Sequence, residues 1–209
     1  MVFEEKRKKE KENRKNTILR AARRLFFDRG FKSVTVDNIA AKSEVSKGSI
    51  YLCFDSKEEI YAQILISDNI ALYERIKNFS ATEASASQLL LEFARIYVDY
   101  FLNDNELFRI LMTFMLQTGQ MNLTEKQNTE LIRSTNENIK IISEIIQKGI
   151  DSGEFPPIGN IRQMQNAIWG MLNGVISLYV FTGNPTKRTE RIHSTVRDSL
   201  NVFIAGLKA

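Results

Sequence analysis

The chain has 209 residues, 43% of them hydrophobic and 26% charged, a composition that suits one or two ordered globular domains with a normal core. Cys53 is the only cysteine and His193 the only histidine, which excludes an intrachain disulfide and a Cys/His metal cluster. His193 lies in a polar, helical-looking stretch without a glycine-rich elbow, so nucleophilic catalysis has no candidate pair. We therefore expect neither an enzyme nor a bound cofactor.

Positive charge is concentrated in the first quarter of the chain. Residues 1–57 carry fifteen Lys and Arg against eight Asp and Glu, whereas the remaining residues carry fourteen against seventeen. The net charges of the two parts are therefore +7 and −3. This asymmetry makes the amino-terminal part a candidate for binding a polyanion.

The first helix is expected after a highly charged segment. Residues 1–12 are nearly all charged, with Glu and Lys at i,i+4 spacing, and form either a flexible arm or a helical extension. They lack the apolar core of a secretory signal, so we expect a cytoplasmic protein. From Asn16, apolar residues repeat on one helical face as far as Arg29, and Gly30 stops the helix.

Two short helices follow, joined by a tight connection at residues 43–45. Thr35 is placed to cap the segment VDNIAAKS, and Ser46 to cap a shorter helix that reaches Leu52. This arrangement, at about residues 35–54, is typical of a helix-turn-helix DNA-binding element. We assign the following apolar residues to its core: Ile39, Ala40, Val45, Ile50 and Phe54.

The rest of the chain has the pattern of six longer helices. One amphipathic helix is expected from Lys57 to about Phe79, and the polar run SATEASAS follows it. Five more are expected at residues 86–103, 105–118, 124–152, 161–182 and 186–208, with breaks at 103–104, 119–120, GEFPPIGN and TGNPT. The apolar run 167–181 is too short to cross a bilayer and predicts a buried helix. The sequence therefore predicts an all-α fold.

The second short helix begins with residues that suit a phosphate. A first helical turn has unpaired N–H groups and a partial positive charge, to which Ser46 adds a cap and Lys47 a cation. Thr35 can offer its hydroxyl to another phosphate, and Tyr51 is placed to reach a phosphate or a thymine methyl. Gly48 has no side chain, which lets the backbone approach DNA closely. In the alternative interpretation, Ser46 and Thr35 are caps only, and Tyr51 is half-buried packing.

The 48 residues from Ile18 to Leu65 resemble the DNA-binding domain of the TetR family of transcriptional regulators. Landmarks of that domain occur here in the same order: AA and LF in the first helix, Gly30–Phe31, Thr35 before Val36, Ile39–Ala40, Val45–Ser46–Lys47–Gly48, Tyr51, Phe54 and Ser56–Lys57–Glu58–Glu59. The resemblance implies a three-helix DNA-binding head, a fourth helix that links it to an all-helical regulatory body, and a homodimer.

The resemblance also implies roles for single residues. Lys57 resembles the lysine that commonly contacts the DNA backbone in this family. Cys53 stands where family members often carry Tyr or His as a phosphate contact, and because a thiol is a weak donor, that interaction should be weakened or absent. Cys53 itself is either a small inert residue or a redox sensor. The expected DNA-binding residues are Thr35, Ser46, Lys47, Gly48, Ser49, Tyr51 and Lys57.

By the same resemblance, the chain divides into a charged extension (residues 1–12), a DNA-binding domain (13–60) and a regulatory and dimerisation domain (61–209). The last two helices, about residues 161–208, are expected to form the dimer interface. Gly170 and Gly174 are small residues one turn apart, which permit close helix approach between subunits or within the chain. The last helix carries one apolar stripe, which faces either the chain's own core or a second subunit: Ile192, Val196, Leu200, Phe203 and Leu207.

Regulatory bodies of this family usually enclose a small-molecule pocket. The sequence offers these residues for an apolar lining with a few orienting polar groups: Phe93, Tyr97, Phe114, Trp169 and Tyr179, with Arg109, Gln117, Asn166 and Asn173. In the alternative interpretation, the aromatic residues are ordinary core. No cluster of charges selects a cationic drug or an acyl-CoA as the ligand.

These observations predict a homodimeric repressor that a small-molecule effector releases from a pseudo-palindromic DNA operator. The expected partners are double-stranded DNA, a second copy of the chain and the effector, with no membrane partner. An activator or a ligand-independent DNA-binding regulator of the same family are the alternatives. A helical enzyme is disfavoured, because neither a paired nucleophile and base nor metal-ligand spacing is present.

Overall fold

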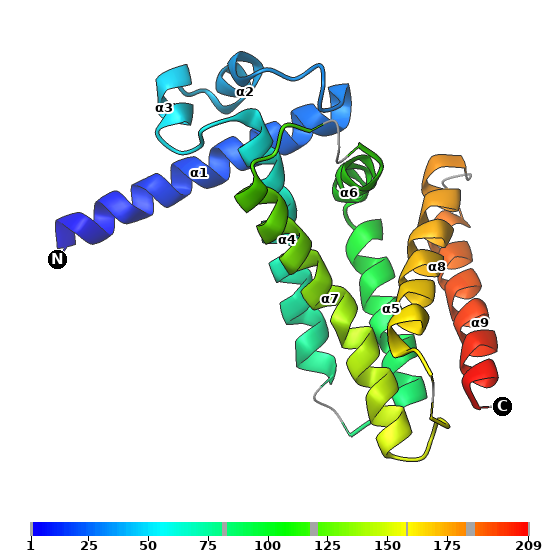
Figure 1. Cartoon of the computed structure of the whole chain (residues 1–209). Coiled ribbons are helices and arrows are strands. Elements are labelled where there is room, and N and C mark those ends of the chain that lie inside the picture. Colours follow the sequence, from blue (N-terminus) through cyan, green and yellow to red (C-terminus); the bar gives the residue numbers. More distant parts are fainter. Residues whose placement is uncertain (1, 81–82, 118–120, 158, 183–186, 209) are drawn as a thin grey trace. The chain divides into compact units, whose positions relative to one another are not determined.

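The computed structural model describes residues 2–80, 83–117, 121–157, 159–182 and 187–208, which form nine α-helices and no strand (Figure 1). The all-α prediction is confirmed. The breaks expected at residues 119–120 and in TGNPT lie outside the described residues, except for Thr182 at the end of a helix. The chain forms two compact units, residues 1–68 with 106–132 and residues 69–105 with 133–209. The division falls inside α4 (Lys57–Ser80) and α7 (Glu125–Asp151), and after the first residue of α6 (Asn105–Gln117).

The first unit begins with α1 (Val2–Arg29). This helix runs without a break through residues 2–12, so the helical alternative for the charged extension is the one observed. It ends at Gly30, whose φ of 74° is a conformation that glycine adopts without a steric penalty. The expected apolar face of α1 is buried, and its buried residues are Ile18, Ala22, Leu25 and Phe26.

The two predicted short helices are α2 (Val36–Ser43) and α3 (Lys47–Tyr51). Their connection turns at Glu44, which has a left-handed φ of 56° and donates its N–H to the last carbonyls of α2. Val45, expected in the core, is half-buried. The other four expected core residues are buried: Ile39, Ala40, Ile50 and Phe54.

An aromatic cluster joins α1, the turn after it and α4. The ring centroids of Phe26, Phe31 and Tyr61 lie 5.1–5.7 Å apart. Tyr61 donates a hydrogen bond of 2.6 Å from its hydroxyl to the main-chain oxygen of Ile110 in α6 (Asn105–Gln117). Burial raises the pKa of Tyr61, so the phenol keeps its proton and remains a donor. The cluster therefore ties α6 to the helix-turn-helix unit.

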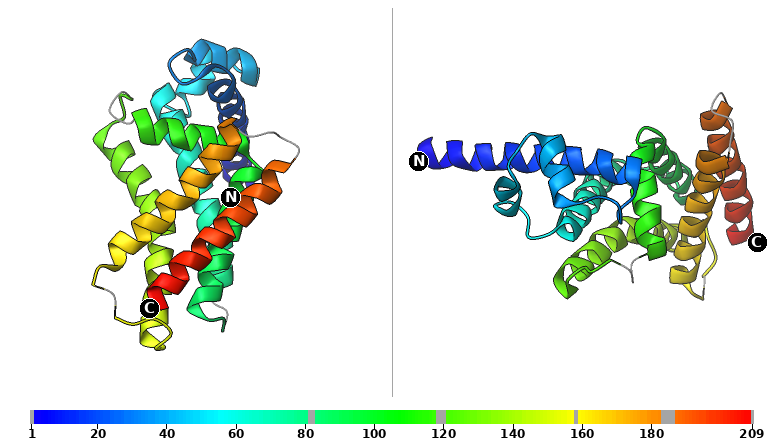
Figure 2. Two further views of the ribbon diagram at one scale, coloured as in Figure 1. Left: turned by 90° about the vertical axis from the view of Figure 1, so that its right-hand side faces the viewer. Right: turned by 90° about the horizontal axis from the view of Figure 1, so that it is seen from above.

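The second unit is built on α5 (Ala86–Leu102), α8 (Ile161–Thr182) and α9 (Arg188–Lys208), with parts of α4 and α7. Helix α9 packs along α5 and α8 (Figure 2). Its apolar stripe is buried within the chain and consists of Ile192, Val196, Leu200, Ile204 and Leu207. Phe203, expected in this stripe, is half-buried. Steps of four residues drift around a helix by about 40° each, which carries the stripe to Ile204.

Helix α8 contains the most apolar segment of the chain, residues 167–181. Ile168, Leu172 and Ile176 point inward from it and are at most 1% exposed, as the predicted buried helix requires. No helix in the described ranges combines the length and the hydrophobicity needed to span a membrane.

Close packing at the end of α7 depends on a glycine. A Cβ atom at Gly149 would overlap the ring of Phe155 and lie 2.8 Å from the Cβ of Ala86. Phe155 is itself 2% exposed. The contact between α7, the segment after it and the start of α5 therefore leaves no room for a side chain at position 149.

We predict that Gly149→Ala lowers the free energy of unfolding by about 1–3 kcal/mol, because the surrounding core must shift to admit the methyl group. Gly159→Ala, in the segment before α8, is the control, since a Cβ there meets nothing within 4 Å and the φ of Gly159 is not left-handed. Urea unfolding followed by circular dichroism, at equal protein concentration, measures both variants. An unchanged stability of Gly149→Ala would contradict the packing described.

Candidate nucleic-acid interface

The start of α2 is fixed by a reciprocal cap. Thr35 accepts a hydrogen bond from the backbone N–H of Asn38 at 3.2 Å, and the side chain of Asn38 accepts one from the N–H of Thr35 at 3.1 Å. Thr35 is exposed, and its hydroxyl proton is not used in this cap. The capping role is thus observed, and it leaves the hydroxyl able to donate to a phosphate.

The start of α3 is fixed by Ser46. Its hydroxyl oxygen accepts a hydrogen bond from the N–H of Ser49 at 3.1 Å, and the two hydroxyl oxygens lie 2.9 Å apart. Ser46 is exposed and Ser49 is half-buried. Both residues proposed to contact DNA at this position therefore also stabilise the short helix.

Gly48 is exposed in the first turn of α3, and neither its backbone nor its neighbours require glycine. Its φ lies outside the left-handed region, which among the glycines that the structure describes is found at Gly30 and Gly153. A Cβ added at Gly48 would meet only the hydroxyl oxygen of Ser46, at 3.9 Å. The absence of a side chain at position 48 thus has no explanation in the packing of the described protomer.

Two large side chains project from the end of α3. Tyr51 is 50% exposed and Leu52, directly after the helix, is 71% exposed. Half of the surface of Tyr51 is thus open to solvent, and its DNA contact stays a prediction. The exposure of Leu52 was not expected from the sequence, because a single leucine next to a buried isoleucine has no pattern that distinguishes it from core.

Lys47 and Asp37 form an ion pair between the first turns of α3 and α2, with Nζ 2.9 Å from Oδ1. The hydrogen bond to Asp37 raises the pKa of Lys47, and both side chains are more than half exposed. The pair brings the amino-terminal ends of both short helices to one face of the unit. Asp37 was missed from the sequence, where ten residues separate it from its partner.

Lys57 at the start of α4 holds the turn between α1 and α2. Its ammonium donates to the main-chain oxygens of Phe31 at 3.1 Å and Val34 at 3.0 Å, and lies 4.5 Å from the centroid of the Phe31 ring. An ammonium has three donors, so two are used within the chain. The structure gives Lys57 a role in shaping the head, and its DNA contact stays a prediction.

Cys53 follows α3 and is half-buried. It lines a groove of about 510 Å³ between the end of α3 and the first half of α1. The lining residues from α1 are Arg7, Lys8, Glu10, Lys11 and Arg14, and those from the α3 side are Leu52 and Cys53. The groove places the charged extension next to the short helix, a proximity that the sequence pattern did not reveal.

The residues proposed to bind an effector fall in both compact units. In the second unit, Tyr97 donates to the side-chain oxygen of Asn173 at 2.9 Å, and Asn173 donates to the main-chain oxygen of Trp169 at 2.9 Å. Phe93 stacks on Tyr97 with centroids 6.1 Å apart. Burial raises the pKa of Tyr97, which keeps its hydroxyl protonated. Asn166 is exposed and lies outside this buried group.

The other proposed effector residues are placed differently. Arg109 and Phe114 lie on α6 in the first unit, where Arg109 is exposed, with its guanidinium 5.0 Å from the ring centroid of Phe27, and Phe114 is 8% exposed. Tyr179 in α8 shares a hydrogen bond of 3.1 Å with Thr195. The side chain of Gln117 lies outside the described residues. Of the expected effector residues whose side chains the structure describes, Phe93, Tyr97, Trp169 and Asn173 are thus brought together.

Two family profiles match the chain. The profile described as "Bacterial regulatory proteins, tetR family" matches residues 18–64, and the profile described as "QacR-like protein, C-terminal region" matches residues 114–209. The first covers the face built from α2 and α3, and the second covers all of α7, α8 and α9.

Individual relatives extend over most of the chain. The Transposon Tn10 TetC protein of Escherichia coli is 30% identical over 151 residues, covering 69% of this chain and 73% of the relative. The HTH-type transcriptional regulator YfiR of Bacillus subtilis is 25% identical over 172 residues, covering 81% of each chain. The structure of the transcriptional regulator FadR from Bacillus subtilis in complex with stearoyl-CoA superposes with a TM-score of 0.74 at 20% identity, covering 88% of this chain and 96% of that one.

For Gly48, we predict that leucine at this position lowers DNA affinity far more than it lowers the midpoint of thermal unfolding. The open space around position 48 admits a side chain in the free protein, whereas the same side chain keeps DNA from the backbone of α3. Electrophoretic mobility shifts and thermal unfolding, compared for Gly48→Leu and wild type, measure the two effects. A DNA affinity that falls only in proportion to the loss of thermal stability would indicate that Gly48 is needed for packing.

Proposed function

Because the chain belongs to the TetR family of bacterial regulatory proteins, and is thus a DNA-binding transcriptional regulator and not an enzyme, we propose that it is a homodimeric repressor. A small-molecule effector releases it from a pseudo-palindromic operator. The observation that carries this proposal is the exposed face on which the starts of α2 and α3 meet through Lys47 and Asp37. The residues proposed to touch DNA are Thr35, Ser46, Lys47, Gly48, Ser49, Tyr51 and Lys57.

Dimerisation through α8 and α9 is supported by small residues on their exposed sides. A Cβ at Gly170 or Gly174 of α8, or at Gly206 of α9, would meet nothing within 4 Å. Such positions are not required by packing inside the protomer, and they allow helices of two subunits to approach closely. Val202, one turn before Gly206, is 75% exposed and supplies an apolar contact on the same side of α9.

A dimer also suits the short length of α3, the helix proposed to contact the bases. Helix α3 has five residues and reaches few base pairs by itself. Two heads related by a twofold axis read two half-sites, which raises both affinity and specificity.

We place the functional division at a head of residues 13–60 and a regulatory body of residues 61–209. Coupling between them runs through α4, which belongs to both, and through α6, which stands in the same compact unit as the head. Arg24 of α1 pairs with Glu106 of α6, and Tyr61 of α4 donates to Ile110 of α6. An effector that shifts α6 or α4 therefore acts on elements already bonded to the head.

For the effector, stearoyl-CoA is the first compound to test, because it is present in the FadR structure that superposes on most of this chain. The buried aromatic and amide group around Tyr97 and Asn173 offers apolar surface and polar groups for a ligand in the second unit. Calorimetric titration into free and operator-bound protein tests the coupling. Equal affinities would overturn effector release, because coupling between two sites is reciprocal.

Genome-wide mapping of the bound DNA tests the function itself. We expect pseudo-palindromic sites, with higher expression of the adjacent genes when the regulator is absent. Lower expression in its absence would favour the activator alternative. Binding and expression that respond to no small molecule would favour the ligand-independent one.

We predict that Lys47→Ala lowers the slope of log affinity against log salt by roughly 0.9 for each phosphate that the lysine neutralises in the wild-type complex. Asp37→Asn removes the carboxylate that competes with the phosphate for Lys47, so DNA affinity at low salt should rise by about two- to fivefold. Fluorescence anisotropy over a salt series measures both. An unchanged slope in Lys47→Ala would show that this lysine does not touch a phosphate.

We also predict that Val202→Asp converts the dimer to a monomer, because a carboxylate would be buried at the proposed interface. Leu116→Asp serves as the matched control, since Leu116 in α6 is 83% exposed and lies outside α8 and α9. Light scattering after size-exclusion chromatography gives the mass of each variant, and circular dichroism checks the fold. A dimeric Val202→Asp protein would place the interface elsewhere.

A further inference from the structure

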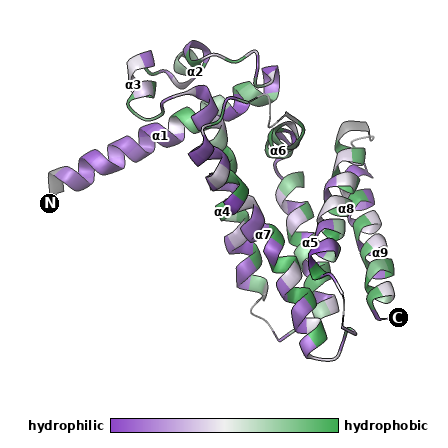
Figure 3. Ribbon diagram, in the orientation of Figure 1, coloured by the Kyte–Doolittle hydropathy of each residue, from purple (hydrophilic) through white to green (hydrophobic). Residues whose placement is uncertain are grey.

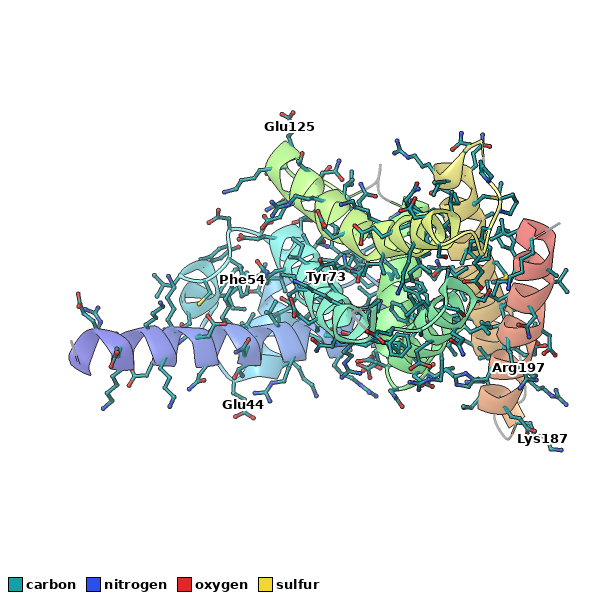
Figure 4. All side chains as sticks on the ribbon, turned by 90° about the horizontal axis from the view of Figure 1, so that it is seen from below. Glu44, Phe54, Tyr73, Glu125, Lys187 and Arg197 are labelled. Atoms are coloured by element: carbon teal, nitrogen blue, oxygen red, sulfur yellow. The ribbon has the colours of Figure 1, made fainter. Side chains whose placement is uncertain are left out.

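The side chains in the N-terminal part of α1 are open to solvent from Glu4 to Arg14. Residues 4–14, here called the N-terminal arm, read EEKRKKEKENR and are all exposed. Figure 3 shows this part of α1 as continuously hydrophilic, and Figure 4 shows the side chains of its first turns standing clear of other elements. The arm contains no apolar residue, so neither a hydrophobic core nor the apolar face of a membrane-surface helix accounts for it.

Basic residues of the arm gather on the side that faces α3. Arg7, Lys8, Lys11 and Arg14 line the groove of about 510 Å³ that ends at Leu52 and Cys53. Glu10 is the one carboxylate residue of this lining. Lys15, the next residue after the arm, holds its ammonium 5.6 Å from the ring centroid of Phe54, which anchors the base of the arm to the head.

Positive charge is concentrated around Lys11 in the free protein. Every residue three or four positions from Lys11 is basic (Arg7, Lys8, Arg14 and Lys15), so like charges repel each other there, and Glu10, three residues from Arg7 and four from Arg14, offsets only part of this charge. Their neighbours across the groove are a leucine and a thiol, which offer no negative charge. A polyanion in the groove removes this repulsion.

We propose that the N-terminal arm is a second DNA-binding element, in which Arg7, Lys11 and Arg14 contact phosphates that flank the bases read by α3. The inference rests on the proposed DNA binding by α2 and α3. When α3 enters a major groove, a phosphate backbone runs along each edge of that groove, and the backbone on the Leu52 side enters the space between α3 and the arm. The three basic residues rise by about 10 Å along the helix, which extends the contact past the half-site.

The arm contributes affinity without sequence preference. Phosphate contacts carry no base information, so the arm tightens operator and random DNA by the same factor. It also widens the protected region of each half-site on the outer side. Both effects depend on salt, because they come from released counterions.

The test compares two double variants with the same loss of charge. Arg7→Gln with Lys11→Gln removes cations that line the groove, whereas Lys6→Gln with Lys9→Gln removes cations of the same helix that do not line it. For the groove variant, the slope of log affinity against log salt should fall by roughly 1.8 for each arm that touches DNA. The control variant should keep the wild-type slope, and circular dichroism should show equal helix content in all three proteins.

Hydroxyl-radical footprinting on an operator duplex with long flanks gives the second readout. Wild type and the control variant should protect backbone positions outside each half-site, and the groove variant should lose only those. On a duplex trimmed to the half-sites, wild type and the groove variant should bind with equal affinity. Equal slopes and footprints for the two double variants would overturn the proposal, and would leave the arm's charge to another partner such as an acidic protein. A wild-type protein that binds no DNA would instead overturn the proposed function.

Discussion

A helix of five residues cannot hold its shape without help, and the exposed face built from α2 and α3 depends on meeting that constraint. Isolated helices need about twelve or more residues to be even marginally stable in water. Helix α3 is held instead by Ile50 and Phe54, which are at most 2% exposed, and by the cap from Ser46 to Ser49. The exposed residues of this helix, Lys47, Gly48 and Tyr51, then stand outside the scaffold and are able to meet a ligand.

The turn that precedes α2 is likewise held by contacts with residues that are distant in the sequence. Lys57 donates to two carbonyls of the turn and lies over the ring of Phe31, which in turn packs on Tyr61. One cation thus satisfies main-chain oxygens that would otherwise need water, and it orients the start of α2 against α4. Lys57 therefore shapes the exposed face built from α2 and α3 through hydrogen bonds within the chain.

The two sides of α9 differ in chemistry. Its inner stripe, from Ile192 to Leu207, is buried against α5 and α8, so it is not available to a second subunit. Its outer side carries Val202 and Gly206, and the outer side of α8 carries Gly170 and Gly174. Small residues on an exposed helical face cost helix stability, and close approach of another helix gives them a physical reason.

The sequence by itself determined the helices, their order and the helix-turn-helix. These are local features, because each depends on residues that are close together in the sequence: the caps at Thr35 and Ser46, the stop at Gly30 and the apolar periodicity of α1. Tertiary structure alone decided which residues meet. Asp37 pairs with Lys47, Lys57 donates to Val34, and the arm lies beside Leu52. Folding brings these positions together from distant parts of the sequence, and no short-range sequence pattern predicts which of them will be in contact. For the same reason the sequence could list aromatic residues for an effector site, but only packing placed Phe93 and Tyr97 with Asn173 and put Arg109 in the other unit.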